Sequence, residues 1–148
     1  MTTSEFKHAI VTFRGVTHPW LCDVMGHLTT RNYLAMFDDA SYHFMASLQT
    51  TPPPIKESGL GWADVKQEIE YLGEIRQGEL TVVRSVPIRV GTKSITFANQ
   101  LSLTDFEDVK ATCVTTSVRF DLNARKAVPI DADIKGALEK WIDGDRPS

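Results

Sequence analysis

The stretch Trp20-Leu21-Cys22-Asp23-Val24-Met25-Gly26-His27-Leu28-Thr29-Thr30-Arg31-Asn32-Tyr33 leads into a long run without glycine or proline that begins at His27. This run, from His27 to Thr51, predicts one helix, because its apolar residues recur at every third or fourth position. The apolar stripe consists of Tyr33, Phe37, Ala40, Phe44 and Leu48, widened by Leu34 and Met45. Gly26 allows a sharp turn ahead of the helix, and the hydroxyls of Thr29 and Thr30 can cap its first N–H groups. Asp23 is therefore expected just before the positive end of a buried helix.

The spacing of residues after Asp23 forms a recognisable motif. Glycine stands three positions on, an aliphatic residue five, asparagine nine and tyrosine ten, as Gly26, Leu28, Asn32 and Tyr33. This pattern resembles the signature of hotdog-fold acyl-CoA thioesterases of the 4-hydroxybenzoyl-CoA thioesterase type. The likeness covers nearly the whole chain, since one long helix, several strands and a short helical tail follow in the same order. There are two departures: Leu21 stands where many relatives have a second acidic residue, and Thr29 and Thr30 stand where many have asparagine or an aromatic residue.

Composition places the chain among ordinary globular proteins. Its 148 residues fit a single domain, 1–148, and a net charge of −3 with scattered basic residues predicts neither nucleic acid nor membrane as a partner. We find no signal peptide and no apolar run long enough to span a membrane, so we expect a cytoplasmic protein. Cys22 and Cys113 show no metal or redox spacing, and we expect reduced thiols. Cys22 beside Asp23 suggests a nucleophile, but no histidine or asparagine is visibly placed to activate it.

Five strands and a second helix are expected around the long helix. Pro19 favours an extended His18, Thr51-Pro52-Pro53-Pro54 ends the helix, and the linker to Gly59 is expected to be a mobile surface loop. The period then changes to two, with Val65, Gln67, Ile69 and Tyr71 facing one side. Pro87 predicts a bulge or an edge, because it cannot donate a ladder hydrogen bond. The predicted strands are Phe6–Arg14, Gly61–Tyr71, Leu80–Val90, Ser94–Leu103 and Val109–Phe120, and the final helix runs from a capping Asp131 to Ile142.

These elements define the fold class. An antiparallel five-stranded sheet that curls around one apolar helix is an α+β arrangement, and the resemblance implies the hotdog fold. A single sheet of this kind leaves its edges unprotected, so pairing with a second copy is expected. The resemblance implies the same: a homodimer, in some relatives a tetramer, with active sites at the subunit interface.

Thioester hydrolysis requires a carboxylate that attacks the carbonyl or activates water, together with N–H donors for the developing oxyanion. Asp23 is the candidate carboxylate, as nucleophile or as general base, and the start of the helix offers unpaired N–H groups and a positive dipole end. By resemblance, the donor is the backbone N–H of Thr30. The alternative for Asp23 is a carboxylate that only caps the helix or the turn before it.

Several other residues are candidates for the site. His27 can orient the carboxylate or the substrate, Gly26 and Tyr33 belong to the motif, and Tyr33 also heads the apolar stripe as a core residue. Gln67 is a polar residue in an apolar file and faces either an acyl pocket or a structural partner. The turn residues Thr92, Lys93 and Ser94 suit the phosphates or pantetheine arm of CoA, or form a plain solvated hairpin. Asp38, Asp39 and His43 suggest a metal site, but only Asp39 and His43 share a helix face. We therefore expect no metal. No cofactor is expected, since CoA is part of the substrate.

The sequence thus favours an acyl-CoA thioesterase that releases a carboxylic acid and a free thiol carrier. Two alternatives use the same fold: a non-catalytic acyl-binding or CoA-binding protein, and a dehydratase acting on 3-hydroxyacyl thioesters. The local histidine pattern of such dehydratases is absent from the sequence, as are the serine hydrolase, P-loop and dinucleotide motifs.

Overall fold

The computed structural model describes residues 5–48 and 58–147. Its elements in chain order are η1 (Glu5–His8), β1 (Ile10–Val16), η2 (Pro19–Leu21), α1 (Thr30–Ser47), β2 (Leu60–Tyr71), β3 (Leu80–Val90), β4 (Ser94–Leu103), β5 (Val109–Asp121), β6 (Lys126–Ala127) and α3 (Ala132–Ile142). Residues 51–57 of the linker that was predicted to be mobile lie outside the described residues. None of the helices in the described ranges is long and apolar enough to cross a membrane.

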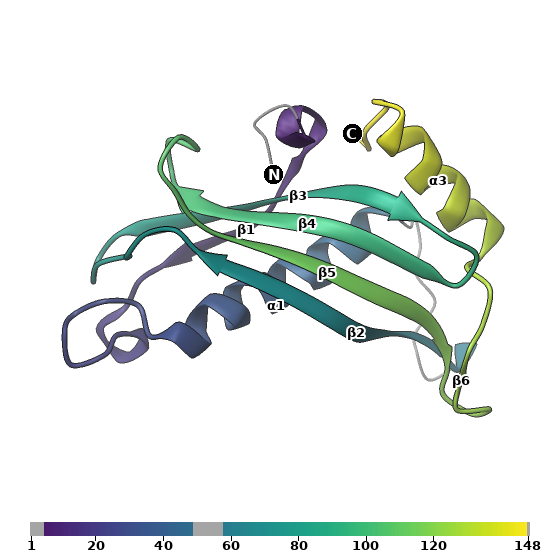
Figure 1. Ribbon diagram of the computed structural model, residues 1–148, viewed down its shortest axis with the longest axis horizontal. Coiled ribbons are helices and arrows are strands. Elements are labelled where there is room, and N and C mark those ends of the chain that lie inside the picture. The colour runs from purple at the N-terminus through teal and green to yellow at the C-terminus, as the bar shows by residue number, and fades with distance from the viewer. Residues whose placement is uncertain (1–4, 49–57, 148) are drawn as a thin grey trace.

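The predicted α+β hotdog architecture is confirmed. Five long strands form an antiparallel sheet in the order β1-β3-β4-β5-β2, and the sheet curls across α1, which lies against one face (Figure 1). The two-residue strand β6, which extends the sheet at the end of β5, was not expected. Consecutive strands form two hairpins, because β3 pairs with β4 and β4 with β5. The expected irregularity at Pro87 is also confirmed, as the register shifts between Pro87 and Arg89.

The first predicted strand begins too early. Residues Glu5–His8 form a 3-10 helix, and β1 starts at Ile10 and continues through Gly15 to Val16. The Ala9 N–H bonds to the Phe6 carbonyl at 3.1 Å, and the Phe6 side chain, 3% exposed, packs on the sheet face away from α1. An aromatic residue that is buried by a turn has the same sequence signature as one in a strand, so the pattern did not separate them.

Helix α1 is shorter than predicted, beginning at Thr30 and ending at Ser47 instead of running from His27 to Thr51. His27 forms an isolated β-bridge with Arg76, and Leu28 forms one with Cys22. Because the backbones of His27 and Leu28 are paired in this way, the helix starts only after them. Thr29 is the N-cap residue, but its side chain makes no capping hydrogen bond. All five residues of the predicted apolar stripe are buried, whereas Leu34 is 38% exposed on the outer flank of the helix.

Helix α3 closes the other end of the core. Phe44 of α1 stacks on Phe97 at 4.5 Å between ring centroids and lies 5.3 Å from Trp141 of α3. Asp131 is the N-cap residue of α3 as predicted, but its carboxylate binds the buried Arg119 at 2.8 Å instead of capping N–H groups. Arg119 also donates to the Gly61 carbonyl, so it ties α3 and β5 to the start of β2.

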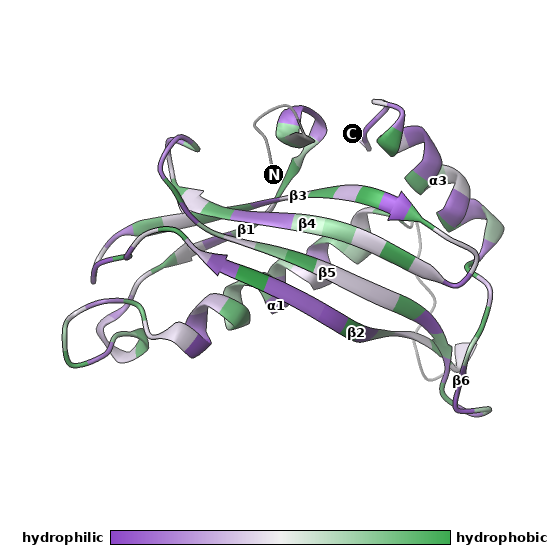
Figure 2. Ribbon diagram, viewed as in Figure 1, coloured by the Kyte–Doolittle hydropathy of each residue, from purple (hydrophilic) through white to green (hydrophobic). Residues whose placement is uncertain are grey.

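The alternation predicted for β2 is only partly present. The register shifts between Asp64 and Lys66, and Val65 is 61% exposed instead of facing the core. Gln67 and Ile69 are half-buried, and Ile69 packs against the core cluster under α1. Figure 2 shows β2 as a largely hydrophilic edge beside the paler strands β4 and β5. Unlike the irregularity at Pro87, this bulge is marked by no proline or glycine at Asp64-Val65-Lys66, so the sequence did not indicate it.

Candidate active site

A tight turn carries Asp23 to the start of α1. We call the residues from Cys22 to Leu28 the Asp23 turn. The Asp23 N–H donates to the His27 carbonyl at 2.8 Å, and the Gly26 N–H donates to the Asp23 carbonyl at 3.0 Å. Gly26 has a φ of 79°, a left-handed conformation that glycine adopts without strain. The glycine of the motif is therefore required by the shape of the turn.

The asparagine of the motif holds this turn against the helix. Asn32 donates from its side-chain amide to the Leu21 carbonyl at 2.8 Å, and the same carbonyl accepts the Thr29 N–H at 3.0 Å. On the other side, the Leu28 N–H donates to the Ile75 carbonyl at 2.7 Å. These bonds fix the Asp23 turn between the first residues of α1 and the segment that leads into β3.

The two oxygens of the Asp23 carboxylate differ in their hydrogen bonds. Oδ1 accepts the Met25 N–H at 2.9 Å and the His27 N–H at 3.2 Å, so it stabilises the turn. Among the described residues, Oδ2 has no hydrogen-bond partner, and the side chain is half-buried. The capping role and a chemical role are thus compatible, because each uses a different oxygen.

Free N–H donors lie at the start of α1. The Asn32 N–H bonds back to the Thr29 carbonyl at 2.8 Å, whereas the N–H groups of Thr30 and Arg31 have no acceptor among the described residues. Such groups carry the positive end of the helix dipole, roughly half a unit charge, and can hold a developing oxyanion. Thr30, the donor expected by resemblance, is exposed.

His27 has a partner that the sequence did not indicate. Its Nε2 lies 3.3 Å from Oε2 of Glu74, while its Nδ1 is buried without a partner among the described atoms. Glu74 lies 47 positions further on, between β2 and β3, and backbone pairing of His27 with Arg76 and of Leu28 with Ile75 brings the two together. A long-range contact of this kind leaves no local sequence signal.

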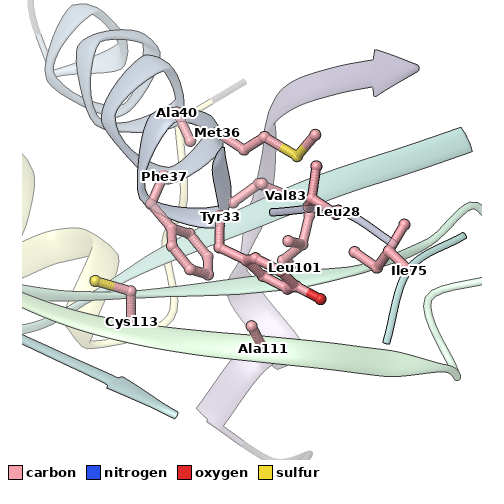
Figure 3. Packing of buried hydrophobic residues seen from close by; sticks show 10 residues of the cluster. All are labelled: Leu28, Tyr33, Met36, Phe37, Ala40, Ile75, Val83, Leu101, Ala111 and Cys113. Atoms are coloured by element: carbon pink, nitrogen blue, oxygen red, sulfur yellow. The ribbon is translucent and has the colours of Figure 1, made fainter. Parts of the chain in front are cut away.

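Tyr33 belongs both to the core and to the site. Its ring is 5% exposed within the core cluster under α1, and its hydroxyl donates to the Gly73 carbonyl at 3.2 Å (Figure 3). Burial raises the pKa of the Tyr33 phenol, the Ile75 backbone opposes this, and the charges of Glu74, Tyr71 and Asp23 raise it further.

The other predicted site residues lie further away. Gln67 is half-buried midway along β2, opposite Thr115. The hairpin of Thr92, Lys93 and Ser94 joins β3 to β4 at the end of the sheet near α3 (Figure 1). Since β3 has 11 residues, the hairpin is about 35 Å from the start of that strand, next to the Asp23 turn. One chain does not bring this hairpin to Asp23.

The cavity between β1 and α1 is not lined by Asp23. It has a volume of about 460 Å³ and is lined by Thr12 and Arg14 on one side and Asp39, Tyr42 and His43 on the other. Within the described ranges, no group of three or more histidine, cysteine, aspartate or glutamate side chains is placed to hold a metal ion. The Cys22 thiol contacts only the His18 carbonyl, at 3.6 Å, among the described residues, which gives it no activating base.

A curled sheet around one helix, with an acid-bearing turn at the helix start, is the arrangement of a hotdog thioesterase. Residues 16–138 match the thioesterase-like superfamily, and the chain belongs to this family. The predicted enzyme class, a thioester hydrolase, is confirmed at the level of the family.

Similar proteins include a longer protein and two solved structures. The L-carnitine dehydrogenase/betainyl-CoA thioesterase of Rhizobium meliloti (strain 1021) is 26% identical over 129 residues, which are 87% of this chain and 26% of that protein. The chain thus spans about a quarter of the curated relative that it matches. A Staphylococcus aureus protein in complex with CoA superposes with a TM-score of 0.83 at 13% identity, covering 95% of this chain and 88% of the other. The 1,4-dihydroxy-2-naphthoyl-CoA thioesterase from Synechocystis gives a TM-score of 0.74 at 16% identity, covering 90% and 96%. At these identities the solved structures support the fold alone.

Proposed function

We propose that this protein is an acyl-CoA thioesterase of the 4-hydroxybenzoyl-CoA thioesterase type, with Asp23 as the acting carboxylate. The observation that carries the proposal is the Asp23 carboxylate, whose Oδ2 has no hydrogen-bond partner among the described residues, on a turn that hydrogen bonds tie to the start of α1. The N–H groups of Thr30 and Arg31 at that helix start also have no acceptor in the described part of the chain. A thioester carbonyl placed between them meets an oxygen base or nucleophile on one side and oxyanion donors on the other. The family membership of the chain supports the same chemistry.

The reaction adds water across the acyl carbon to sulfur bond. Asp23 either removes a proton from the attacking water or attacks the carbonyl itself, forming an anhydride that water then opens. In both routes the negative charge that develops on the carbonyl oxygen is held by the helix N–H groups, and the thiol leaves with a proton. His27, fixed by Glu74 at 3.3 Å, is placed to orient the substrate or the carboxylate.

The substrate is proposed to be a CoA thioester, with no separate cofactor. Because the similar Rhizobium protein is a betainyl-CoA thioesterase, betainyl-CoA comes first among the substrates to test. The 1,4-dihydroxy-2-naphthoyl-CoA thioesterase from Synechocystis adds a substrate with an aromatic acyl group. The alternatives remain a protein that binds acyl-CoA without turnover and a dehydratase of 3-hydroxyacyl thioesters. Hydrolysis of a saturated acyl-CoA would exclude the protein that only binds acyl-CoA. Hydration of crotonyl-CoA would identify the dehydratase.

A second copy of the chain is proposed to complete the site. Strand β2 is an edge of the sheet with 12 residues, and Val24 and Met25 of the Asp23 turn are 104% and 70% exposed. Apolar side chains and an unpaired strand edge favour association. A homodimer also offers a route by which a distant hairpin such as Thr92, Lys93 and Ser94 reaches the CoA of the other copy.

The test is thiol release from a panel of aliphatic, aromatic and cationic acyl-CoAs. Asp23→Asn keeps an oxygen that accepts the turn hydrogen bonds but removes the negative charge, so we expect kcat/KM to fall at least a hundredfold. Asp38→Asn removes the same charge from an exposed position on α1 and should leave kcat/KM within about twofold. Turnover of Asp23→Asn close to that of the wild type would contradict the proposed role.

A further inference from the structure

A half-buried guanidinium lies on the face of the sheet away from α1. The guanidinium carbon of Arg84, in β3, is 5.9 Å from the ring centroid of Phe6 and 4.8 Å from that of Phe106. Its Nη2 donates to the side-chain oxygen of Gln100 at 2.6 Å, whereas its Nε is buried without a hydrogen-bond partner in the described part of the chain. Burial lowers the pKa of this guanidinium, because the charged form is less stable away from water. Only a neutral amide and two rings therefore compensate the charge.

A second unpaired donor stands on the neighbouring strand. Ser102 of β4 is 0% exposed, and its hydroxyl has no hydrogen-bond partner among the described residues. Gln100 lies directly opposite Arg84 in the register of the two strands, and Ser102 follows two residues later on the same face. Such diagonal positions are about 7–8 Å apart at the backbone, a gap that two hydrogen bonds to one shared acceptor can span. Two buried donors without an acceptor thus lie side by side.

The acidic residues nearest to Arg84 along β4 and the turn after it have other partners. Asp105 accepts the N–H of Glu107 at 3.1 Å, and Asp108 is paired with Lys110 at 2.9 Å. The Glu107 side chain is exposed, and no carboxylate among the described residues forms an ion pair with Arg84. A buried charge normally has a paired counter-charge, so the compensating group here is not one of these carboxylates.

The remaining charges on this face also favour an anion. Glu70 of β2 lies in the same cross-strand row as Arg84 but three strands away, about 14 Å at roughly 4.8 Å per strand. Arg14 of β1 lies in the same cross-strand row as Ser102, with only β3 between them. Two cations therefore flank the Ser102 hydroxyl, and the acid is far from it.

We propose that the Nε of Arg84 and the hydroxyl of Ser102 together bind a small monovalent anion of the halide class, with chloride as the probe. A monatomic anion fits better than an organic acid or a nucleotide, because Ser102 is fully buried and two rings cover the guanidinium. Phe106 covers the site from the turn after β4, where its φ of 64° is unfavourable for a bulky side chain. An anion in this place supplies the missing acceptor for both donors and ties β3 to β4.

The experiment measures the melting temperature in sodium chloride and in sodium gluconate at equal ionic strength, so that screening is the same in both. A ligand that binds only the folded protein raises its stability by mass action, and we expect Tm to be at least about 3 °C higher in saturating chloride. Sodium bromide should reproduce the shift. Equal melting temperatures in chloride and gluconate would overturn the proposal.

The variants assign the shift to the two donors. Ser102→Ala removes the hydroxyl and Arg84→Met removes the guanidinium, and each should reduce the difference between chloride and gluconate to below about 1 °C, whatever its own Tm. Arg89→Met removes a charge from an exposed position of the same strand and should keep the full difference. A difference that persists in Ser102→Ala and Arg84→Met would place the chloride effect elsewhere and overturn the proposal.

Bromide also locates the ion. Crystals soaked in sodium bromide should give an anomalous peak between the Arg84 Nε and the Ser102 hydroxyl. A peak there without a chloride-dependent Tm would mark an adventitious ion only, and a water in its place would show that the donors need no anion; either result would refute the site. Neither readout uses thioester hydrolysis, so the outcome is independent of the proposed function.

Discussion

At the scale of single residues, the Asp23 motif is a description of one turn. Gly26 provides its left-handed residue, Asn32 ties it to the helix, and Asp23 uses one oxygen to close it. The sequence predicted the turn at Gly26 and a capping carboxylate at Asp23, because both depend on neighbours a few positions away. The bond from Asn32 to Leu21 was not predicted. Glu74 was missed because its contact with His27 depends on how two distant segments pair.

The turn predicts a clean effect for Gly26→Ala. A Cβ at Gly26 would have nothing within 4 Å, so the substitution creates no clash and acts only through the φ of 79°. An alanine held there costs about 1 kcal/mol in the free energy of unfolding, and relaxation of the turn displaces the Asp23 carboxylate. We expect a lower urea midpoint and a fall in kcat of at least tenfold.

The control for this substitution is Gly136→Ala on helix α3. Its Cβ also meets nothing within 4 Å, and its φ is not in the left-handed range, so alanine should be neutral or stabilising there. If Gly26→Ala behaved like Gly136→Ala in stability and activity, the conformational requirement at the turn would be wrong.

At the scale of elements, the ends of helices and strands were the least predictable features. The stripe of α1 was read correctly because a period of 3.6 residues extends over the whole helix. Its start was placed three residues early, because the backbone of His27 and Leu28 pairs with Arg76 and Cys22 instead. Similarly, Phe6 and Ala9 look like strand residues but lie at a 3-10 turn that packs on the sheet. Such boundaries are decided by tertiary partners, which no local pattern contains.

Helix α3 is joined to the sheet by one buried guanidinium. The Arg119 side chain is 5% exposed, binds Asp131 at 2.8 Å and lies over the Trp62 ring at 5.3 Å. Arg119→Met keeps the volume but leaves the half-buried Asp131 without its cation, so the free energy of unfolding should fall by about 2 kcal/mol. Lys66→Ala breaks an ion pair whose side chains are 64% and 62% exposed, and should cost less than about 0.5 kcal/mol. Equal urea midpoints for the two variants would show that Arg119 does not hold α3 to the sheet.

At the scale of the whole molecule, the sequence predicted the sheet, its central helix and the position of Asp23, but not how the site is enclosed. Gln67 and the hairpin of Thr92, Lys93 and Ser94 were chosen for their chemistry, and one chain leaves that hairpin at the far end of the sheet from Asp23. The walls of a pocket assembled from two copies depend on an interface, and residue types along one chain do not specify which surfaces meet.

The exposed β2 edge and the apolar Asp23 turn predict that activity depends on assembly. Light scattering should give a mass of about twice the 16.5 kDa of one chain, or a multiple of it. If a second copy closes the site, dilution below the dissociation constant should lower the specific activity in parallel with the dimer fraction, because mass action removes the complete site. Mixing inactive Asp23→Asn chains with wild type then leaves activity proportional to the wild-type chains, since each site needs only one Asp23. A protein that remains fully active at the mass of one chain would show that the turn and helix of a single copy suffice.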